Sequence, residues 1–309
     1  VQFYADEIVQ GKRNMKQGKT NSSSSISFFL TIILIIQLVV VLYPIAFTIG
    51  AAFTKSNSLA ATSIVPFPRN PSLFQFRRLL TPANEFVKGT TDVLGTNYVH
   101  WYLNTLQIAC MNTVLTVLLC STVGYIFSRF TFPFRKTVMA SMIILQMFPS
   151  FIGMIATYVI LWKINGLNTL WGLVLVYAAG SLPFNSWLMK GYFDTVPKEL
   201  AEAAYIDGAS PFTAFARVVL PAAKPQLVFL ALTSFTGPWM DFIFPRLVLR
   251  SDDKKTLAVG LYEMISGRAA DNFTMFAAGA LLVAVPFTVL FMLGQKALIQ
   301  SLAGTGGKE

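Results

Sequence analysis

Long apolar runs alternate with polar segments along most of the chain. About 20 residues of helix span the hydrocarbon core of a bilayer, and most of these runs reach or exceed that length. A cleavable signal peptide would have a shorter apolar region than the first run and no such long polar preface. The pattern therefore predicts an all-α membrane protein with six transmembrane helices, at about residues 26–53, 101–128, 137–162, 170–189, 226–245 and 273–293.

Prolines and glycines mark where these helices are expected to bend. Pro44 can kink the first run, Pro149 lies inside the third, and Gly237-Pro238 is expected to interrupt the fifth. Proline removes a backbone donor, and a break at membrane depth is tolerated only where protein or a cavity surrounds it. Pro149, Gly237 and Pro238 are therefore candidate hinges or pathway bends, with ordinary helix kinks as the alternative.

The polar segments divide the chain into four parts. Residues 1–25 are basic and end in a run of serines, and they are expected to form a flexible cytosolic segment. Residues 26–94 hold the first transmembrane helix and a proline-rich extracytoplasmic loop. Residues 95–300 form the core transmembrane domain, and residues 301–309 a cytosolic tail rich in glycine.

Composition agrees with a membrane location and narrows the chemistry. The 309 residues are 54% apolar and 12% charged, with a mean hydropathy of +0.59, whereas soluble domains carry about 25% charged residues. The net charge of +10 does not indicate nucleic-acid binding, because the basic residues are scattered over the loops. His100 is the only histidine and has no neighbouring ligands, which argues against a catalytic or metal site. Gly18-Lys19-Thr20 lacks the earlier glycine and the strand of a phosphate-binding loop, so no ATP site is expected in this chain.

Six crossings would place both termini on the same side of the membrane. Basic residues divide almost evenly between the two sides, but the rule that they mark the cytosol is weighted to short loops near helix ends. The short loop at 129–136 carries Arg129, Arg135 and Lys136. Both termini and this loop are therefore predicted to be cytosolic.

A polar stretch at residues 196–225 stands between two apolar runs and predicts a short helix that ends at a glycine. Pro197 suits a first turn, and the residues that follow it are good helix formers. Glu199 and Glu202 lie near the positive end of the helix dipole. Gly208 then stands where a helix ends in a left-handed residue.

A second helix is predicted directly after this glycine. Ser210 fits its N-cap and Pro211 its first turn. The helix is expected to run for about ten residues, until Pro221 and Pro225 end it. The local prediction is therefore helix, glycine corner, helix, at a membrane surface.

This stretch closely resembles the EAA loop of the permease subunits of ATP-binding-cassette (ABC) importers, in which Glu-Ala-Ala is followed by a glycine and later by Leu-Pro. In that family the short helix docks into a groove on the ATPase and transmits force. The resemblance implies a coupling role for Glu202, Ala203, Ala204, Asp207, Gly208, Ala209, Leu220 and Pro221.

Each role has a simpler alternative. Glu202 can pair with basic residues of the ATPase groove, or it can merely stabilise the helix dipole. Ala203 and Ala204 can let backbones approach closely, or they can reflect helix propensity alone. Gly208 is a backbone requirement in either case. The stretch could also be an amphipathic helix lying on lipid, but its two acidic residues argue against contact with an anionic surface.

Further segments are similar to carbohydrate permeases of the maltose (MalG) type, and the similarity extends from about residue 95 to the end of the chain. The matching segments are 146–149, 166–169, 190–193, 256–260 and the tail from 302 to 308. In the family such a tail reaches the ATPase interface; a frayed end is the alternative. Met240 stands before Asp241 where many sugar permeases have asparagine, which weakens a sugar contact there.

The resemblance implies a machine of several subunits in the bacterial plasma (inner) membrane. Its expected partners are a second permease of the MalF type, a homodimeric ABC ATPase and an extracytoplasmic sugar-binding protein. The ATPase would bind ATP and Mg²⁺, so this chain would be a non-catalytic subunit without a cofactor of its own. The implied cargo is maltose, maltodextrin or a related oligosaccharide, and another solute class is the alternative.

A stand-alone secondary transporter is a second alternative. Such proteins often contain internal repeats and charged residues near the bilayer midplane. The sequence shows no convincing repeat and no central charge pair. Asp241 is the only acid in a predicted span, near its outer end, where it is either part of a gate or sugar path or a hydrated interfacial acid.

Overall fold

The chain folds into a bundle of long helices. The computed structural model describes residues 2–58, 62, 67–68, 70–266 and 272–306. In these ranges the chain is mostly helical, and its β structure is one isolated antiparallel bridge between Phe86 and Leu94. The prediction of an all-α class is confirmed, although residues 307–309 of the predicted tail lie outside the described part.

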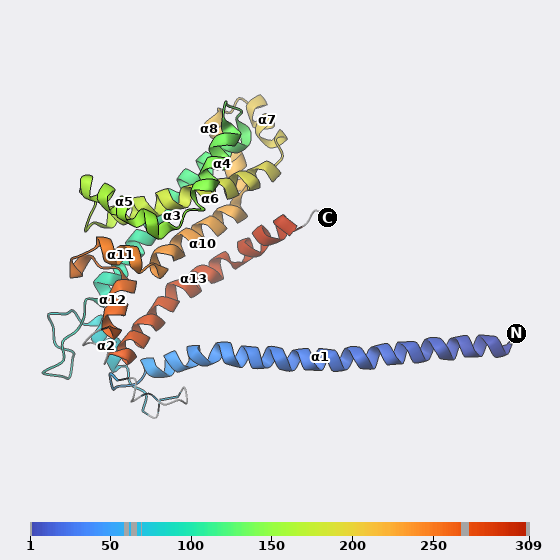
Figure 1. Ribbon diagram of the computed structural model, residues 1–309, viewed down its shortest axis with the longest axis horizontal. Coiled ribbons are helices and arrows are strands. Elements are labelled where there is room, and N and C mark those ends of the chain that lie inside the picture. Colours follow the sequence, from blue (N-terminus) through green and yellow to red (C-terminus); the bar gives the residue numbers. More distant parts are fainter. Residues whose placement is uncertain (1, 59–61, 63–66, 69, 267–271, 307–309) are drawn as a thin grey trace.

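Four helices form the bundle: α3 (Tyr98–Arg129), α6 (Leu170–Thr195), α10 (Lys224–Met240) and α13 (Phe273–Gly306). α3 packs against α6 and α10, and α13 packs against α10 and α1. Gly124 allows the close crossing of α3 and α6, because a Cβ there would lie 2.7 Å from Met189 Cβ. α2 (Phe74–Leu80) and α12 (Leu257–Ile265) lie at one end of the bundle, and α7 (Glu199–Ile206) and α8 (Pro211–Ala214) at the other (Figure 1).

Fewer helices than predicted are long enough to cross a membrane alone. In the described ranges four segments are long and apolar enough: Ser27–Ala52, Tyr98–Arg129, Leu170–Thr195 and Phe273–Lys296. A fifth candidate is the pair Pro211–Ala222 and Lys224–Met240, which is bent by 82°. The predicted span without a single long helix is the one in the third apolar run.

The third run is broken rather than continuous. It forms α4 (Arg135–Leu145) and α5 (Ser150–Lys163), with Pro149 as the N-cap of α5. Between them the amides of Met147 and Phe148 bond only three residues back, to Ile144 and Leu145. Proline disfavours a helical conformation in the residue before it and offers no amide, so the helix stops here. The run predicted as the third span, at 137–162, therefore consists of two helices, and the prediction of a helix break at Pro149 is confirmed.

The fifth apolar run was predicted to be interrupted, but its helix is continuous at the predicted break. α10 continues through Gly237-Pro238, where an interruption was predicted, and ends only at Met240. Pro238 cannot donate to the carbonyl of Ser234, one turn earlier. The side-chain amide of Asn112 on α3 donates to that carbonyl instead, at 2.8 Å. A side chain from a neighbouring helix thus replaces the missing backbone donor, and the helix does not break.

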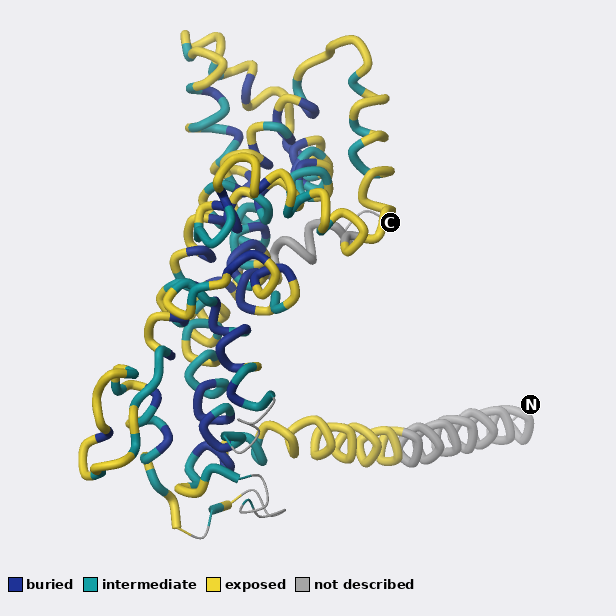
Figure 2. The backbone as a smooth tube through the Cα atoms, turned by 60° about the vertical axis from the view of Figure 1, so that its left-hand side comes forward, coloured by how far each residue is buried: buried dark blue, intermediate teal, exposed yellow. Residues whose placement is uncertain are grey.

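The first helix is longer than predicted. α1 runs from Gln2 to Ala52 without a break at Pro44, and its N-terminal part projects away from the bundle (Figure 1). Residues 2–25, expected to form a flexible segment, have a helical backbone. Extending an existing helix by a residue is far easier than nucleating one, so residues such as lysine and glutamine continue it. Residues 27–45 of α1 are exposed (Figure 2), whereas Ala51 and Ala52 are buried at the bundle.

A polar network closes the end of the bundle that carries α2 and α12. The indole of Trp101 on α3 donates to the carbonyl of Asp252 at 2.8 Å, and Lys255 pairs with Asp252 (2.8 Å) and Glu263 (2.7 Å). Burial raises the pKa of Asp252, but hydrogen bonds from Lys255 and Asn97 outweigh it and bring the pKa below its ordinary value. Burial lowers the pKa of Lys255, but its two carboxylate partners outweigh this and raise the pKa. Both groups are therefore charged at neutral pH.

Candidate functional site

The helix predicted after Val196 ends at a glycine corner, as expected. α7 closes with a Schellman turn, in which the amide of Ala209 donates to the carbonyl of Ala204 (2.9 Å) and the amide of Gly208 to that of Tyr205 (3.0 Å). Gly208 has a φ of +84°, a left-handed conformation that side chains with a Cβ disfavour. The corner therefore depends on this glycine.

The second helix also begins as predicted. Ser210 is the N-cap of α8, and its hydroxyl accepts a hydrogen bond from the amide of Thr213 at 3.2 Å. Pro211 occupies the first turn, where its missing amide leaves no unsatisfied partner. The two helices thus meet at a corner with satisfied backbone groups on both sides.

The end of the second helix differs from the prediction. The chain remains helical through a π turn, η2 (Phe215–Val219), and through α9 (Leu220–Ala222), and so passes Pro221. In the wider π turn the amide of Leu220 bonds to the carbonyl of Phe215, which accommodates the following proline. The chain then bends by 82° into α10.

Aromatic and apolar contacts attach this helix pair to the ends of α3 and α6. The ring of Phe215 lies 4.5 Å from that of Tyr125 on α3 and 6.4 Å from that of Phe193 on α6. Ala201 of α7 and Val219 of the π turn are buried in the same cluster. The helix pair is therefore packed directly against the ends of α3 and α6.

Arg129 reinforces this attachment. Its guanidinium donates to the carbonyls of Phe193 (3.1 Å) and Val196 (2.7 Å), at the C-terminal end of α6. The Phe193 carbonyl also accepts from the amide of Val196 at 3.2 Å, and a cation at a helix C-terminus interacts favourably with the dipole. α3 and α6 are therefore held together just before α7 begins.

The opposite side of the helix pair is exposed and combines apolar with acidic side chains. Ile206 is 87% exposed and Phe212 76% exposed, unusual values for such large apolar residues. Glu199, Glu202 and Asp207 are exposed as well, and none of them takes part in an ion pair among the described residues. We call the exposed part of residues 199–212 the coupling surface.

The eight predicted coupling residues divide between this surface and the anchored side. Glu202, Ala203, Asp207, Gly208 and Pro221 are exposed, and Ala204, Ala209 and Leu220 are half-buried. Leu220 packs against the cluster that anchors the pair. Their geometry suits a docking element with a rigid base, while their contact with an ATPase remains a prediction. Sequence reasoning missed Ile206 and Phe212, although both are large apolar residues inside the polar stretch.

The candidate pathway residue Asp241 is used by the fold. Its Oδ2 accepts a hydrogen bond from the Tyr177 hydroxyl at 2.9 Å, and its Oδ1 accepts from the amides of Ile243 (3.1 Å) and Phe244 (3.4 Å). These amides begin α11 (Ile243–Val248) and would otherwise lack partners. Asp241 therefore caps α11 and ties it to α6.

Tyr177 lies between two cavities. One, of about 320 Å³, has α3, α6 and α10 around it and includes the predicted bend residues Gly237 and Pro238 in its wall. The other, of about 780 Å³, lies between α5 and α6 and includes Asp241. Pro149 lines neither cavity, so three of the four pathway candidates gather here and the fourth does not.

The smaller cavity has a mostly apolar wall, and sequence reasoning missed the uncharged polar groups that lie in it. The Ser234 hydroxyl is buried and has no hydrogen-bond partner among the described residues, and the Ser181 hydroxyl lies 3.3 Å from that of Thr116. The wall presents amides and hydroxyls from three helices: Asn112, Asn185, Tyr177, Ser181, Thr233 and Ser234. Such groups can exchange hydrogen bonds with a hydroxyl-rich ligand without requiring a charge on it.

Two substitutions of Asp241 test whether its side chain serves only as a hydrogen-bond acceptor in the fold or whether its negative charge is needed for transport. In Asp241→Asn one oxygen still accepts from the two amides and the new amide can donate to Tyr177, so wild-type thermal unfolding and transport are expected. Asp241→Leu leaves these groups unpaired and should destabilise the protein by about 1–3 kcal/mol. Thermal unfolding of the purified protein and a transport assay provide the comparison. Loss of transport in Asp241→Asn at unchanged thermal stability would instead show that the charge is needed.

Comparison with known proteins gives the same picture. Residues 120–304 match the family described as "Binding-protein-dependent transport system inner membrane component". The chain is 39% identical over 280 residues to the maltodextrin transport system permease protein MdxG of Bacillus subtilis, covering 91% of this chain and 94% of that protein. It is 35% identical over 280 residues to the galactooligosaccharides transport system permease protein GanQ of the same organism, covering 91% and 95%.

Solved structures share the fold. The structure of a bacterial ABC transporter involved in the import of the acidic polysaccharide alginate aligns with a TM-score of 0.77 at 19% identity, covering 90% of this chain and 98% of that one. At this identity the likeness concerns the fold alone. The family match covers more than half of the chain, and the relatives match nearly all of it. The chain belongs to the family of binding-protein-dependent transport system inner membrane components, the membrane subunits of ABC importers.

Proposed function

We propose that this chain is the permease subunit of an ATP-driven importer for maltodextrin or a related oligosaccharide. The support for this cargo is the match to permeases whose names specify maltodextrin and galactooligosaccharides. The uncharged amides and hydroxyls in the wall of the smaller cavity suit such a cargo. The chain itself is a non-catalytic subunit: ATP and Mg²⁺ are bound by a separate ATPase, which works with a second permease and an extracytoplasmic sugar-binding protein.

The coupling surface is proposed to dock into a groove on that ATPase. The observation that carries this proposal is an exposed apolar and acidic surface on a helix whose base is fixed to α3 and α6. Apolar side chains such as Ile206 and Phe212 supply contact area, and Glu202 can pair with basic residues of the groove. Closure of the ATPases on ATP would then move α7 as a rigid body and shift the ends of α3 and α6.

The chain is proposed to cross the bacterial plasma (inner) membrane six times with both termini in the cytosol. In this arrangement α4 and α5 together form the third crossing, and α10 provides the fifth. The basic loop at 129–136 and the coupling surface then face the cytosol together, which agrees with the position of an ATPase.

The smaller cavity is proposed to contact the sugar as it passes. The side chain of Asn185 is half-buried in its wall and can both donate to and accept from sugar hydroxyls. Replacing it by leucine should lower oligosaccharide uptake about tenfold, which corresponds to one lost hydrogen bond of about 1.4 kcal/mol.

The matched control for this substitution is Gln295→Leu. Gln295 is also an amide on a spanning helix, but it is exposed and lies outside the cavity. Uptake in proteoliposomes should be unchanged in Gln295→Leu. Equal uptake by the Asn185→Leu and wild-type proteins would remove Asn185 from the sugar path.

Reconstitution tests the function as a whole. Purification of this chain from its native cells should also isolate an ATPase and a second permease. ATP hydrolysis by that complex in liposomes should rise when a maltodextrin-loaded binding protein is added. A chain that transports a solute alone, driven by a proton gradient, would contradict the proposal and favour a secondary transporter.

A further inference from the structure

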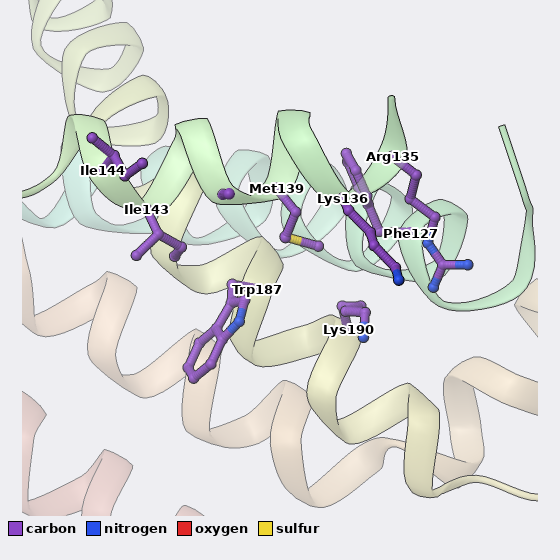
Figure 3. Close-up of a pocket in the computed structure, with 9 residues that line it drawn as sticks. Phe127, Arg135, Lys136, Met139, Ile143, Ile144, Trp187 and Lys190 are labelled. Carbon is purple, nitrogen blue, oxygen red and sulfur yellow. The ribbon is translucent and has the colours of Figure 1, made fainter. Parts of the chain in front are cut away.

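A groove of about 610 Å³ between α4 and α6 is not used by the coupling surface or the sugar cavity. α4 buries none of its residues in this chain, so one side of the groove is open. Figure 3 shows basic side chains at one end of the groove and apolar side chains along the rest. The lining consists of Phe127, Arg135, Lys136, Met139, Ala140, Ile143, Ile144, Trp187 and Lys190.

The basic end carries more positive charge than the chain neutralises. Arg135 and Lys136 begin α4, and Lys190 faces them from α6 (Figure 3). Lys190 pairs with Asp194 at 2.5 Å, and Arg135 donates to the carbonyl of Phe130 at 3.2 Å. Among the described residues no carboxylate pairs with Arg135 or Lys136. This end of the groove therefore favours an anion.

The rest of the groove is apolar. Met139 and Ile143 lie one and two turns along α4 from the basic end, and Trp187 stands opposite them on α6 (Figure 3). An occupant must therefore combine an anionic group with a hydrocarbon chain that runs from it along the helices. A phospholipid with an anionic headgroup has this chemistry, because arginine and lysine bind its phosphate and apolar side chains contact its acyl chain.

We propose that the groove between α4 and α6 binds one anionic phospholipid, with its headgroup at Arg135, Lys136 and Lys190 and an acyl chain against Met139, Ile143 and Trp187. With the orientation proposed above, this lipid belongs to the cytosolic leaflet. It bridges α4, which buries nothing in this chain, to the part of α6 that precedes the coupling surface. The site is separate from the sugar cavity, and lipid binding can be measured without transport.

Lipid binding to the purified transporter complex tests this site. The complex is stripped of lipid in detergent, and native mass spectrometry follows binding of phosphatidylglycerol or phosphatidylcholine. Removing two headgroup cations in Arg135→Gln/Lys136→Gln should weaken phosphatidylglycerol binding at least about tenfold, at roughly 1 kcal/mol for each basic residue. The control Lys88→Gln/Lys163→Gln removes the same charge from exposed positions outside the groove and should bind like wild type.

A second variant covers the case in which the double substitution disturbs assembly. Ala140→Trp fills the apolar part of the groove and leaves the cations in place, and it should also lose the bound phosphatidylglycerol. Equal retention of phosphatidylglycerol and phosphatidylcholine by the wild-type complex would overturn the proposal. So would displacement of the lipid by inorganic phosphate, which would indicate a site for free phosphate. Capture of the second permease by a photo-cross-linker at Met139 would also overturn it, because the groove would then be a subunit interface.

Discussion

A transporter that carries Gly208→Val should hydrolyse ATP but import almost no oligosaccharide. Gly208 has a φ of +84° at the corner that ends α7, and a β-branched residue there is strained by about 1–2 kcal/mol. A Cβ would meet no atom within 4 Å, so the substitution changes the backbone of the corner without a steric clash in the core. The Schellman turn is then lost, and α7 no longer has a fixed direction relative to α3 and α6. ATPase activity and uptake, both measured in proteoliposomes, report the uncoupling.

Gly208→Asn is the matched control. Asparagine tolerates the left-handed conformation and finds the same open space, so most of the coupling should remain. Aspartate also tolerates the left-handed conformation, but it adds an acidic group to the coupling surface. We therefore expect the uptake of Gly208→Asp to lie between the uptake of Gly208→Asn and that of Gly208→Val. Sugar-stimulated ATPase activity and uptake at wild-type levels in Gly208→Val would contradict a coupling role for the corner.

Ile206→Asp should abolish co-purification of the ATPase without unfolding the permease. Ile206 is 87% exposed, so its replacement removes no packing within this chain. If the side chain is buried in the ATPase groove, placing a carboxylate there should cost 2 kcal/mol or more, roughly the effect of a hot-spot substitution. The amount of ATPase that remains bound after affinity purification measures the effect, and membrane insertion and thermal stability should be those of wild type.

Phe67→Asp provides the comparison for this substitution. Phe67 is 76% exposed, also apolar, and lies in the loop that precedes α2, away from α7. It should leave the ATPase bound. Full retention of the ATPase by Ile206→Asp would show that the exposed apolar part of the surface is not the docking contact.

Local chemistry made the helix pair predictable. The glycine corner, the serine cap and the first-turn proline each follow from the conformational limits of single residues, and all three are present at Gly208, Ser210 and Pro211. The all-α class followed equally directly from the length of the apolar runs. These features depend on neighbours in sequence and need no knowledge of tertiary contacts.

Tertiary contacts decided the features that were predicted wrongly. Pro149 breaks its helix, yet Pro238 does not, because the Asn112 amide supplies a donor to the carbonyl of Ser234. Asn112 is distant from Pro238 in sequence, so the difference between the two prolines could not be read locally. Pro221 also leaves its helix unbroken: it follows a π turn whose first residue, Phe215, packs against Tyr125 on another helix.

The candidate site shows the same division. The motif at 202–209 could be found from sequence because its residues are consecutive or nearly so. The polar cavity could not, since its wall comes from three helices and each residue alone resembles an ordinary polar residue in a spanning helix. Asp241 was singled out as a rare acid, but its hydrogen bonds to Tyr177 and to the start of α11 depend on the fold.

A photo-cross-link from the coupling surface tests the central claim most directly. Benzoylphenylalanine in place of Phe212 preserves an aromatic side chain at a position that is 76% exposed. On irradiation of the reconstituted complex in liposomes, the account predicts a covalent product between this chain and the ATPase subunit. The account would be contradicted if this chain cross-linked only to lipid, or if it cross-linked to no other subunit of the complex.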